Sequence, residues 1–256
     1  MPKFAANLTM MFTEVPFLER FGRARRAGFR GVEYLSPYVA EPAEIRARLD
    51  EHGLEQVLYN TNPGNFEAGE RGTAAVPSLE SRFDADIDQA LRYAGTLRPG
   101  NIHIMAGRAD GPKARETFVA NLKKACAKAP AQGFVIEPIN TRDMPGYFLT
   151  TTTQAKDIIA DVGAPNLKLQ LDLYHCQIME GDLTRRIEAL APLVAHVQIA
   201  AVPDRHEPDT GETNLGHLLS ALDRAGYTGW IGCEYRPAGV TEEGLGWFVP
   251  YKEAAS

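Results

Sequence analysis

Short apolar runs rich in β-branched and aromatic residues alternate along this chain with longer segments of helical periodicity. Eight such runs can be counted, at residues 4–8, 31–35, 56–60, 101–105, 134–139, 167–175, 195–200 and 230–235. An amphipathic segment follows each run. Eight strand–helix units in series predict a closed parallel (β/α)8 barrel, a TIM barrel, rather than an open sheet.

Two of the expected helices have clear sequence boundaries. In the first, Phe17, Phe21 and Ala24 form an apolar stripe that ends at Gly28. The second, at residues 42–53, opens on a proline and closes on a glycine. Proline at the first helical position and glycine just past the last are typical helix boundaries.

The chain shows no internal repeat, low-complexity tract or linker rich in proline, glycine and serine. We therefore expect residues 1–256 to form a single domain, a length that suits one barrel. The two longest irregular stretches, residues 61–78 and 201–214, follow the third and seventh expected strands. Both should lie at the carboxyl ends of the strands, the face that carries the active site in such barrels.

The composition limits the kinds of molecule that this protein is expected to bind. Hydrophobic residues make up 44% and charged residues 23% of the chain, as in ordinary globular proteins. A net charge of −6 opposes nucleic-acid and anionic-membrane binding, and no apolar run approaches the roughly 18 residues of a membrane span. Three widely spaced cysteines favour a reduced, cytoplasmic protein. A small-molecule substrate is favoured, and a homo-oligomer is compatible with the sequence.

Strand parity indicates which side chains face the barrel interior. In the sixth expected strand, Leu169, Leu171 and Leu173 alternate with Gln170 and Asp172. Because successive side chains of a strand point to opposite faces, the leucines should pack outward against helices. The polar residues should then point inward.

The same parity turns a polar side chain inward near the carboxyl end of four consecutive strands: Glu137, Asp172, Gln198 and Glu234. Any one of them could be a helix cap or an ion-pair partner. Together, three carboxylates without a cationic side chain among them would repel one another inside an apolar barrel, unless a cation compensates them. Oxygen ligands favour one divalent ion such as Mg²⁺ or Mn²⁺.

Several charged residues near this face remain ambiguous from sequence alone. His175 follows Asp172 by three residues, so it either lines the site or caps the next helix. Arg205 is either one half of a solvated ion pair with its loop neighbours or a clamp for a substrate anion. Glu70 and Arg71 are either a solvated loop pair or substrate contacts. The histidines 52, 103, 196 and 217 have no recognisable metal spacing.

The chain closely resembles the hydroxypyruvate isomerase family of xylose-isomerase-like barrels. The resemblance runs from end to end, through the segments FAANLTMMF, GFRGVEYLSPY, AGERG, IEPIN, PGYFLT, LDLYHCQIMEGDLT, HVQIA, EPDTGETN and GWIGCEY. It implies that Glu137, Asp172, Gln198 and Glu234 ligate the metal, and that Glu137 and Glu234 also donate and accept the proton. It further implies substrate contacts from the following residues: Asn60, Glu70, Arg71, His175 and Arg205.

The reaction expected from the resemblance is the isomerisation of hydroxypyruvate to tartronate semialdehyde through an enediolate. Ketose epimerases of the superfamily carry histidine where this chain has Gln198, which favours the acid isomerases. Ala201 and Asp209 depart from the family pattern of aspartate and glycine, so the substrate is left open.

The alternatives are an isomerase of a four-carbon 2-oxo acid (2-oxo-tetronate) and a ketose 3-epimerase. A repair-type endonuclease would need more metal-binding histidines and a basic groove. A catalytically silent sugar-acid binding protein would be expected to have lost one of the two glutamates, and both are present.

Overall fold

Eight parallel strands close into a barrel in the computed structural model, which describes residues 2–252. Each strand pairs with the next along the chain, and the last pairs with the first. The strands are β1 (Lys3–Asn7), β2 (Gly31–Tyr34), β3 (Glu55–Asn60), β4 (Asn101–His103), β5 (Gly133–Ile136), β6 (Leu167–Asp172), β7 (Val194–Ile199) and β8 (Trp230–Cys233). The (β/α)8 prediction is confirmed.

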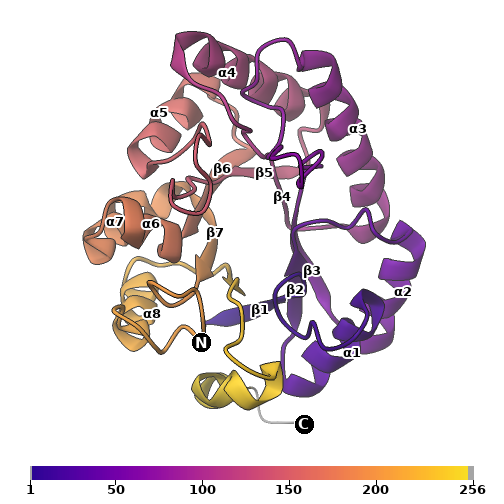
Figure 1. The fold of residues 1–256 in the computed structure, drawn as a ribbon, viewed down its shortest axis with the longest axis vertical. Coiled ribbons are helices and arrows are strands. Elements are labelled where there is room, and N and C mark those ends of the chain that lie inside the picture. The colour runs from indigo at the N-terminus through magenta and orange to yellow at the C-terminus, as the bar shows by residue number, and fades with distance from the viewer. Residues whose placement is uncertain (1, 253–256) are drawn as a thin grey trace.

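Helices form a ring around this barrel (Figure 1). They are α1 (Phe17–Ala27), α2 (Pro42–His52), α3 (Glu80–Leu97), α4 (Gly111–Lys128), α5 (Thr152–Val162), α6 (Leu173–Met179), α7 (Leu183–Leu190), η1 (Ala191–Leu193), α8 (Leu215–Arg224) and η2 (Thr241–Tyr251). The last unit ends in the 3₁₀ segment η2, drawn in yellow between α8 and α1. Its Phe248 stacks on Phe29, with ring centroids 4.4 Å apart, and so closes the ring of helices.

Both helix boundaries expected from the sequence are confirmed. Helix α1 ends at Gly28 and α2 at Gly53, each with a positive φ (108° and 61°) that glycine adopts without strain. Residues 61–78 and 201–214 connect strand ends to α3 and α8, as predicted. None of the helices within residues 2–252 is long and apolar enough to cross a membrane.

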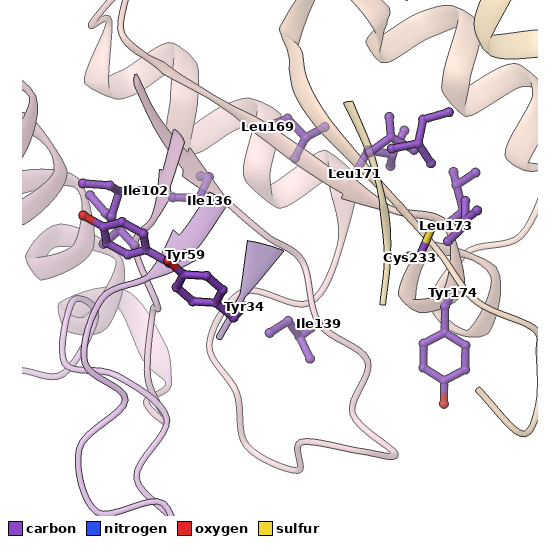
Figure 2. Close-up of a cluster of buried hydrophobic side chains, with 14 of the residues drawn as sticks. Tyr34, Tyr59, Ile102, Ile136, Ile139, Leu169, Leu171, Leu173, Tyr174 and Cys233 are labelled. Atoms are coloured by element: carbon purple, nitrogen blue, oxygen red, sulfur yellow. The ribbon is translucent and has the colours of Figure 1, made fainter. Parts of the chain in front are cut away.

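The main core lies between the outer face of the barrel and the helices. Leu169 and Leu171 are buried there, as parity predicts (Figure 2). Tyr34 of β2 packs edge-on against Phe17 and Phe21 of α1, and its ring is nearly parallel to that of Tyr59 on β3. Side chains of the opposite parity are thereby turned into the barrel.

The prediction of one long strand over residues 167–175 is wrong at its end. Strand β6 stops at Asp172, and Leu173 begins α6 instead of packing outward from the strand. The physical reason is a helix cap, because Asp172 Oδ1 accepts the backbone N–H groups of Tyr174 (2.7 Å) and His175 (3.4 Å). The predictions for residues 134–139 and 230–235 also ran past the ends of β5 and β8.

Candidate active site

Three carboxylates and one imidazole meet at the carboxyl ends of the strands. Glu137 directly follows β5, Asp172 ends β6, His175 lies in the first turn of α6 and Glu234 directly follows β8. Each offers a ligand atom, and these atoms all lie within 4.8 Å of one another. All four side chains are buried, with at most 4% of their surface exposed. Such a group could hold a metal ion.

Arg205 reaches into this cluster from the loop between β7 and α8. Its Nη2 donates to Glu234 Oε2 (2.6 Å) and lies 3.6 Å from Asp172 Oδ2. The expectation that no cationic side chain lies among the carboxylates is therefore wrong, and so is the interpretation of Arg205 as a solvated pair, because its side chain is buried. The backbone explains its direction. Arg205 has a positive φ of 56°, and its N–H donates to Ala201 O (2.9 Å) in a tight turn.

The electrostatics of the cluster favour a divalent cation. Three carboxylates face one guanidinium, so full ionisation would leave two negative charges uncompensated in a buried site. Burial, with Asp172 and Glu33 nearby, raises the pKa of Glu234 to about 8, although Arg205 opposes the shift. Burial and the same kind of repulsion raise the pKa of Glu137 well above its usual value.

Two carboxylate oxygens of the cluster have no hydrogen-bond partner among residues 2–252. They are Glu137 Oε1 and Asp172 Oδ2, and both are buried. Buried polar atoms are nearly always satisfied, so two orphaned oxygens in one cluster require an explanation. A hard divalent ion supplies one, since carboxylate oxygen is the ligand that Mg²⁺ and Mn²⁺ prefer. The donor set therefore fits the metal expected from the sequence.

Gln198 points into the barrel, as predicted, and lies beside Asp172 in the register of β6 and β7. Its Nε2 donates to Glu33 Oε1 (2.8 Å), and its Oε1 accepts from Gln170 Nε2 (2.6 Å). The amide oxygen is thus engaged by Gln170 in this structure. Asn7 donates to both Glu33 and Glu234, so Gln198 is linked to the carboxylate cluster through two hydrogen-bonded side chains.

Glu33 and His103 are buried groups of this site that sequence reasoning missed. Glu33 accepts from Asn7 and Gln198 and contacts His196 Nε2 at 2.6 Å. It lies between Val32 and Tyr34, which face outward, so strand parity turns Glu33 inward. The same rule identified the other carboxylates. His103, set aside for want of metal spacing, lies with its Nδ1 3.4 Å from Glu137 Oε2. Burial lowers the pKa of His103 to about 3, so it is neutral.

Glu70 and Arg71, the predicted contacts in the β3–α3 loop, do not form an ion pair with each other. Glu70 binds Arg82 of α3 through two hydrogen bonds (2.7 and 2.8 Å), which hold the pKa of Glu70 at about 2. Arg71 stacks on Phe66 and donates to two loop carbonyl groups. Asn60 is buried at the end of β3, and its Oδ1 has no hydrogen-bond partner in the described part of the chain.

Comparisons with known proteins extend over nearly the whole chain. Residues 21–251 match the family model described as "Xylose isomerase-like TIM barrel". A 2-oxo-tetronate isomerase from Cupriavidus necator is 52% identical over 98% of this chain and 99% of its own length. Hydroxypyruvate isomerase from Escherichia coli is 42% identical over 98% of this chain and 100% of its own.

One solved structure is about as similar in sequence to this chain as these relatives are. A crystal structure from Brucella melitensis, named "AP endonuclease, family 2", is 51% identical, with a TM-score of 0.97 over 99% of this chain and 100% of the other. Structures of sugar epimerases, such as a D-psicose 3-epimerase from Clostridium cellulolyticum, are 19% identical and share the fold. By its sequence and its barrel, this chain belongs to the xylose isomerase-like TIM barrel family.

Proposed function

We propose that this protein is an isomerase of small 2-oxo acids that moves a proton between the second and third carbons of its substrate. The observation that carries the proposal is the cluster of buried carboxylates at the catalytic face, with an arginine among them. Paired carboxylates with raised pKa values can exchange protons with carbon near neutral pH. The names of relatives that are 42% and 52% identical over nearly their full lengths support the same activity.

Glu137, Asp172, Glu234 and Gln198 are the proposed metal ligands. The unpartnered oxygens of Glu137 and Asp172 support the first two assignments. For Gln198, the amide oxygen must first be released by Gln170. A bound Mg²⁺ or Mn²⁺ would stabilise the negative charge that develops on neighbouring substrate oxygens during the reaction.

Side chains of the cluster supply the remaining chemistry. One of Glu137 and Glu234 removes the carbon-bound proton to give the enediolate, and the other delivers a proton to the neighbouring carbon. A hydroxyl proton passes in the same reaction from one of the two neighbouring oxygens to the other, so that the carbonyl and hydroxyl groups exchange places. Arg205 is the proposed partner of the substrate carboxylate, because its planar guanidinium can donate two parallel hydrogen bonds. In this structure it binds Glu234 instead, so it must share its donors between that residue and the substrate.

The substrate is proposed to have three or four carbons. The relative with 52% identity bears the name of a four-carbon acid isomerase, which puts 2-oxo-tetronate first. Hydroxypyruvate, the acid expected from the sequence, is the second candidate, through the relative with 42% identity. Ala201, one of the two departures from the family pattern, lies in the turn that orients Arg205 and can therefore affect acid recognition.

A substrate panel tests this proposal. The metal-loaded protein is incubated with 2-oxo-tetronate, hydroxypyruvate or a neutral ketohexose, and proton NMR follows the products. We expect conversion of the acids, fastest for the four-carbon one, and little conversion of the ketohexose. Turnover of the ketohexose alone would reassign the protein to the epimerases, and turnover of none would remove the proposed activity.

An endonuclease is the second candidate, because the 51% identical structure from Brucella melitensis carries that name. The net charge of −6 opposes binding to a polyanion. The same preparation should therefore leave a duplex that contains an abasic site uncut under conditions in which it isomerises the acid. Cleavage of that duplex without acid turnover would favour the endonuclease.

A further inference from the structure

Asn140 lies behind His175, on the side away from the carboxylates. It is fully buried, three residues beyond Glu137, in the turn that follows β5. Its Nδ2 lies 2.6 Å from His175 Nδ1. A contact between an amide and an imidazole can run in either direction, so the orientation of the amide decides which nitrogen of the ring carries the proton.

Three neighbouring groups determine that orientation. Asn140 Oδ1 accepts the backbone N–H groups of Arg142 (3.0 Å) and Asp143 (2.8 Å). Asn140 Nδ2 also donates to Asp143 Oδ2 (3.1 Å). Turning the amide over would place its NH₂ against two N–H donors and its oxygen against a carboxylate. The observed orientation is therefore the one that satisfies these groups.

It follows that Asn140 donates to His175 and that Nδ1 of the imidazole accepts. An accepting Nδ1 carries no proton, so the ring is neutral and its proton is on Nε2. That nitrogen faces the cluster, 3.5 Å from Asp172 Oδ2 and 3.8 Å from Glu137 Oε1, and it also lies 3.5 Å from the donor Nη2 of Arg205. The 2.6 Å contact of Asn140 with Nδ1 is much shorter than that of Arg205 with Nε2, so the Asn140 contact decides which nitrogen accepts. A protonated Nε2 has no lone pair for a metal ion and can donate a hydrogen bond to a substrate oxygen.

We propose that Asn140 is a positioning residue that holds His175 as the Nε2–H tautomer, so that His175 is a hydrogen-bond donor to the substrate and not a metal ligand. This inference rests on the proposed isomerase function for its use of the substrate. The tautomer itself does not depend on the substrate, because it is set by the 2.6 Å contact of Asn140 with Nδ1. The donor would face an oxygen that becomes negatively charged in the enediolate, where a hydrogen bond strengthens as the reaction proceeds.

Nitrogen NMR of the histidine rings tests the tautomer without substrate or metal. In ¹⁵N-labelled protein, long-range proton–nitrogen correlations distinguish Nε2–H from Nδ1–H, and loss of signal in His175→Gln assigns the ring. We expect the Nε2–H pattern for His175 in the native protein. An Nδ1–H pattern, or an imidazolium at neutral pH, would overturn the inference.

Asn140→Asp makes the test sharper, because a carboxylate of the same shape can only accept. His175 should then carry a proton on Nδ1, and kcat/KM for the acid substrate should fall by about tenfold to a hundredfold, as is typical for groups that orient site residues. Asn121→Asp is the matched control, since Asn121 is a buried asparagine that donates to Ala74 O at a distance from the site. It should leave the His175 pattern unchanged.

The outcomes separate this inference from the proposed function. Native protein with the Nε2–H pattern and no acid turnover would remove the isomerase function and leave the tautomer assignment in place. Acid turnover with an unaltered His175 pattern in Asn140→Asp would remove the role of Asn140 and leave the isomerase. If Asn140→Asp does not fold, the native spectrum alone still decides the tautomer.

Discussion

At the scale of single residues, the candidate site depends on which buried groups can move a proton. Glu137 and Glu234 are both buried, and the pKa of each is raised. Replacing either with glutamine keeps the shape but removes the ability to take up a proton. We expect Glu137→Gln and Glu234→Gln each to lower kcat about 10²- to 10⁴-fold.

A matched control shows what the loss of a buried charge does when the residue is outside the cluster. Asp86 is a buried carboxylate that accepts from Thr73 outside the cluster, so Asp86→Asn should retain most of the activity. Metal content must be measured in every variant, because the glutamates are also proposed ligands. Full turnover in either glutamine variant with native metal content would exclude that residue as the acid or base.

Arg205 gives the second prediction at this scale. If it binds the substrate carboxylate, Arg205→Ala should raise KM for the acid about tenfold to a hundredfold. Arg205→Lys keeps the charge but loses the planar fork, and should recover part of the loss. Because Arg205 also binds Glu234, kcat must be measured separately. Equal weakening of acidic and neutral substrates would place the carboxylate clamp elsewhere.

Parity along the strands predicted which side chains of the site point inward, and the structure brings Glu137, Asp172 and Glu234 together. The same rule applied to residues 31–34 would have found Glu33. It could not have found Asn140, which lies beyond the strand, nor the approach of Arg205, which depends on a loop residue with positive φ. Turns set the positions of both residues, and in a turn the sequence pattern does not predict where a side chain points.

At the scale of elements, Asp172 serves β6 and α6 at once. Its Oδ1 caps α6, whereas its Oδ2 faces the cluster and accepts no hydrogen bond from the residues that the structure describes. Asparagine is an equally good cap but a poorer metal ligand. We expect Asp172→Asn to keep the thermal stability of the metal-free protein and to weaken Mn²⁺ binding, whereas Asp172→Ala should also lose about 1 kcal/mol of stability.

Calorimetry of the metal-free variants and titration with Mn²⁺ separate the two roles. Equal destabilisation by both variants would show that the cap does not depend on the accepting oxygen. Native Mn²⁺ affinity in Asp172→Asn would remove Asp172 from the ligand set. The double role also explains why the strand predicted from periodicity extended beyond Asp172. The apolar residue at position 173 continues the strand pattern, whereas the cap that starts a helix there leaves no trace in that pattern.

At the scale of the whole molecule, the closed barrel leads us to propose that the chain is a single domain with one cooperative unfolding transition. Every strand is paired on both sides. Phe248 of η2, near the end of the chain, stacks on Phe29, which follows α1. A metal bound only by the folded barrel should raise the temperature of that transition. At a hundredfold excess over its dissociation constant, Mn²⁺ should raise Tm by about 5 to 10 °C.

Differential scanning calorimetry with and without a chelator measures this shift. Two separate transitions would contradict the single-domain proposal. A transition that responds to neither chelator nor Mn²⁺ would contradict the metal site. Asp86→Asn is again a suitable control, because it should lower Tm without altering the size of the metal-dependent shift.

The central claim is that the buried glutamates move a proton, and not a hydride, between two carbons of a small 2-oxo acid. Turnover in D₂O, followed by NMR, tests it most directly, with substrate deuterated at the carbon that loses hydrogen as the paired experiment. We predict deuterium from solvent on the carbon that receives the proton, and loss of the substrate label to water. Product free of solvent deuterium, with the substrate label fully retained, would contradict the account.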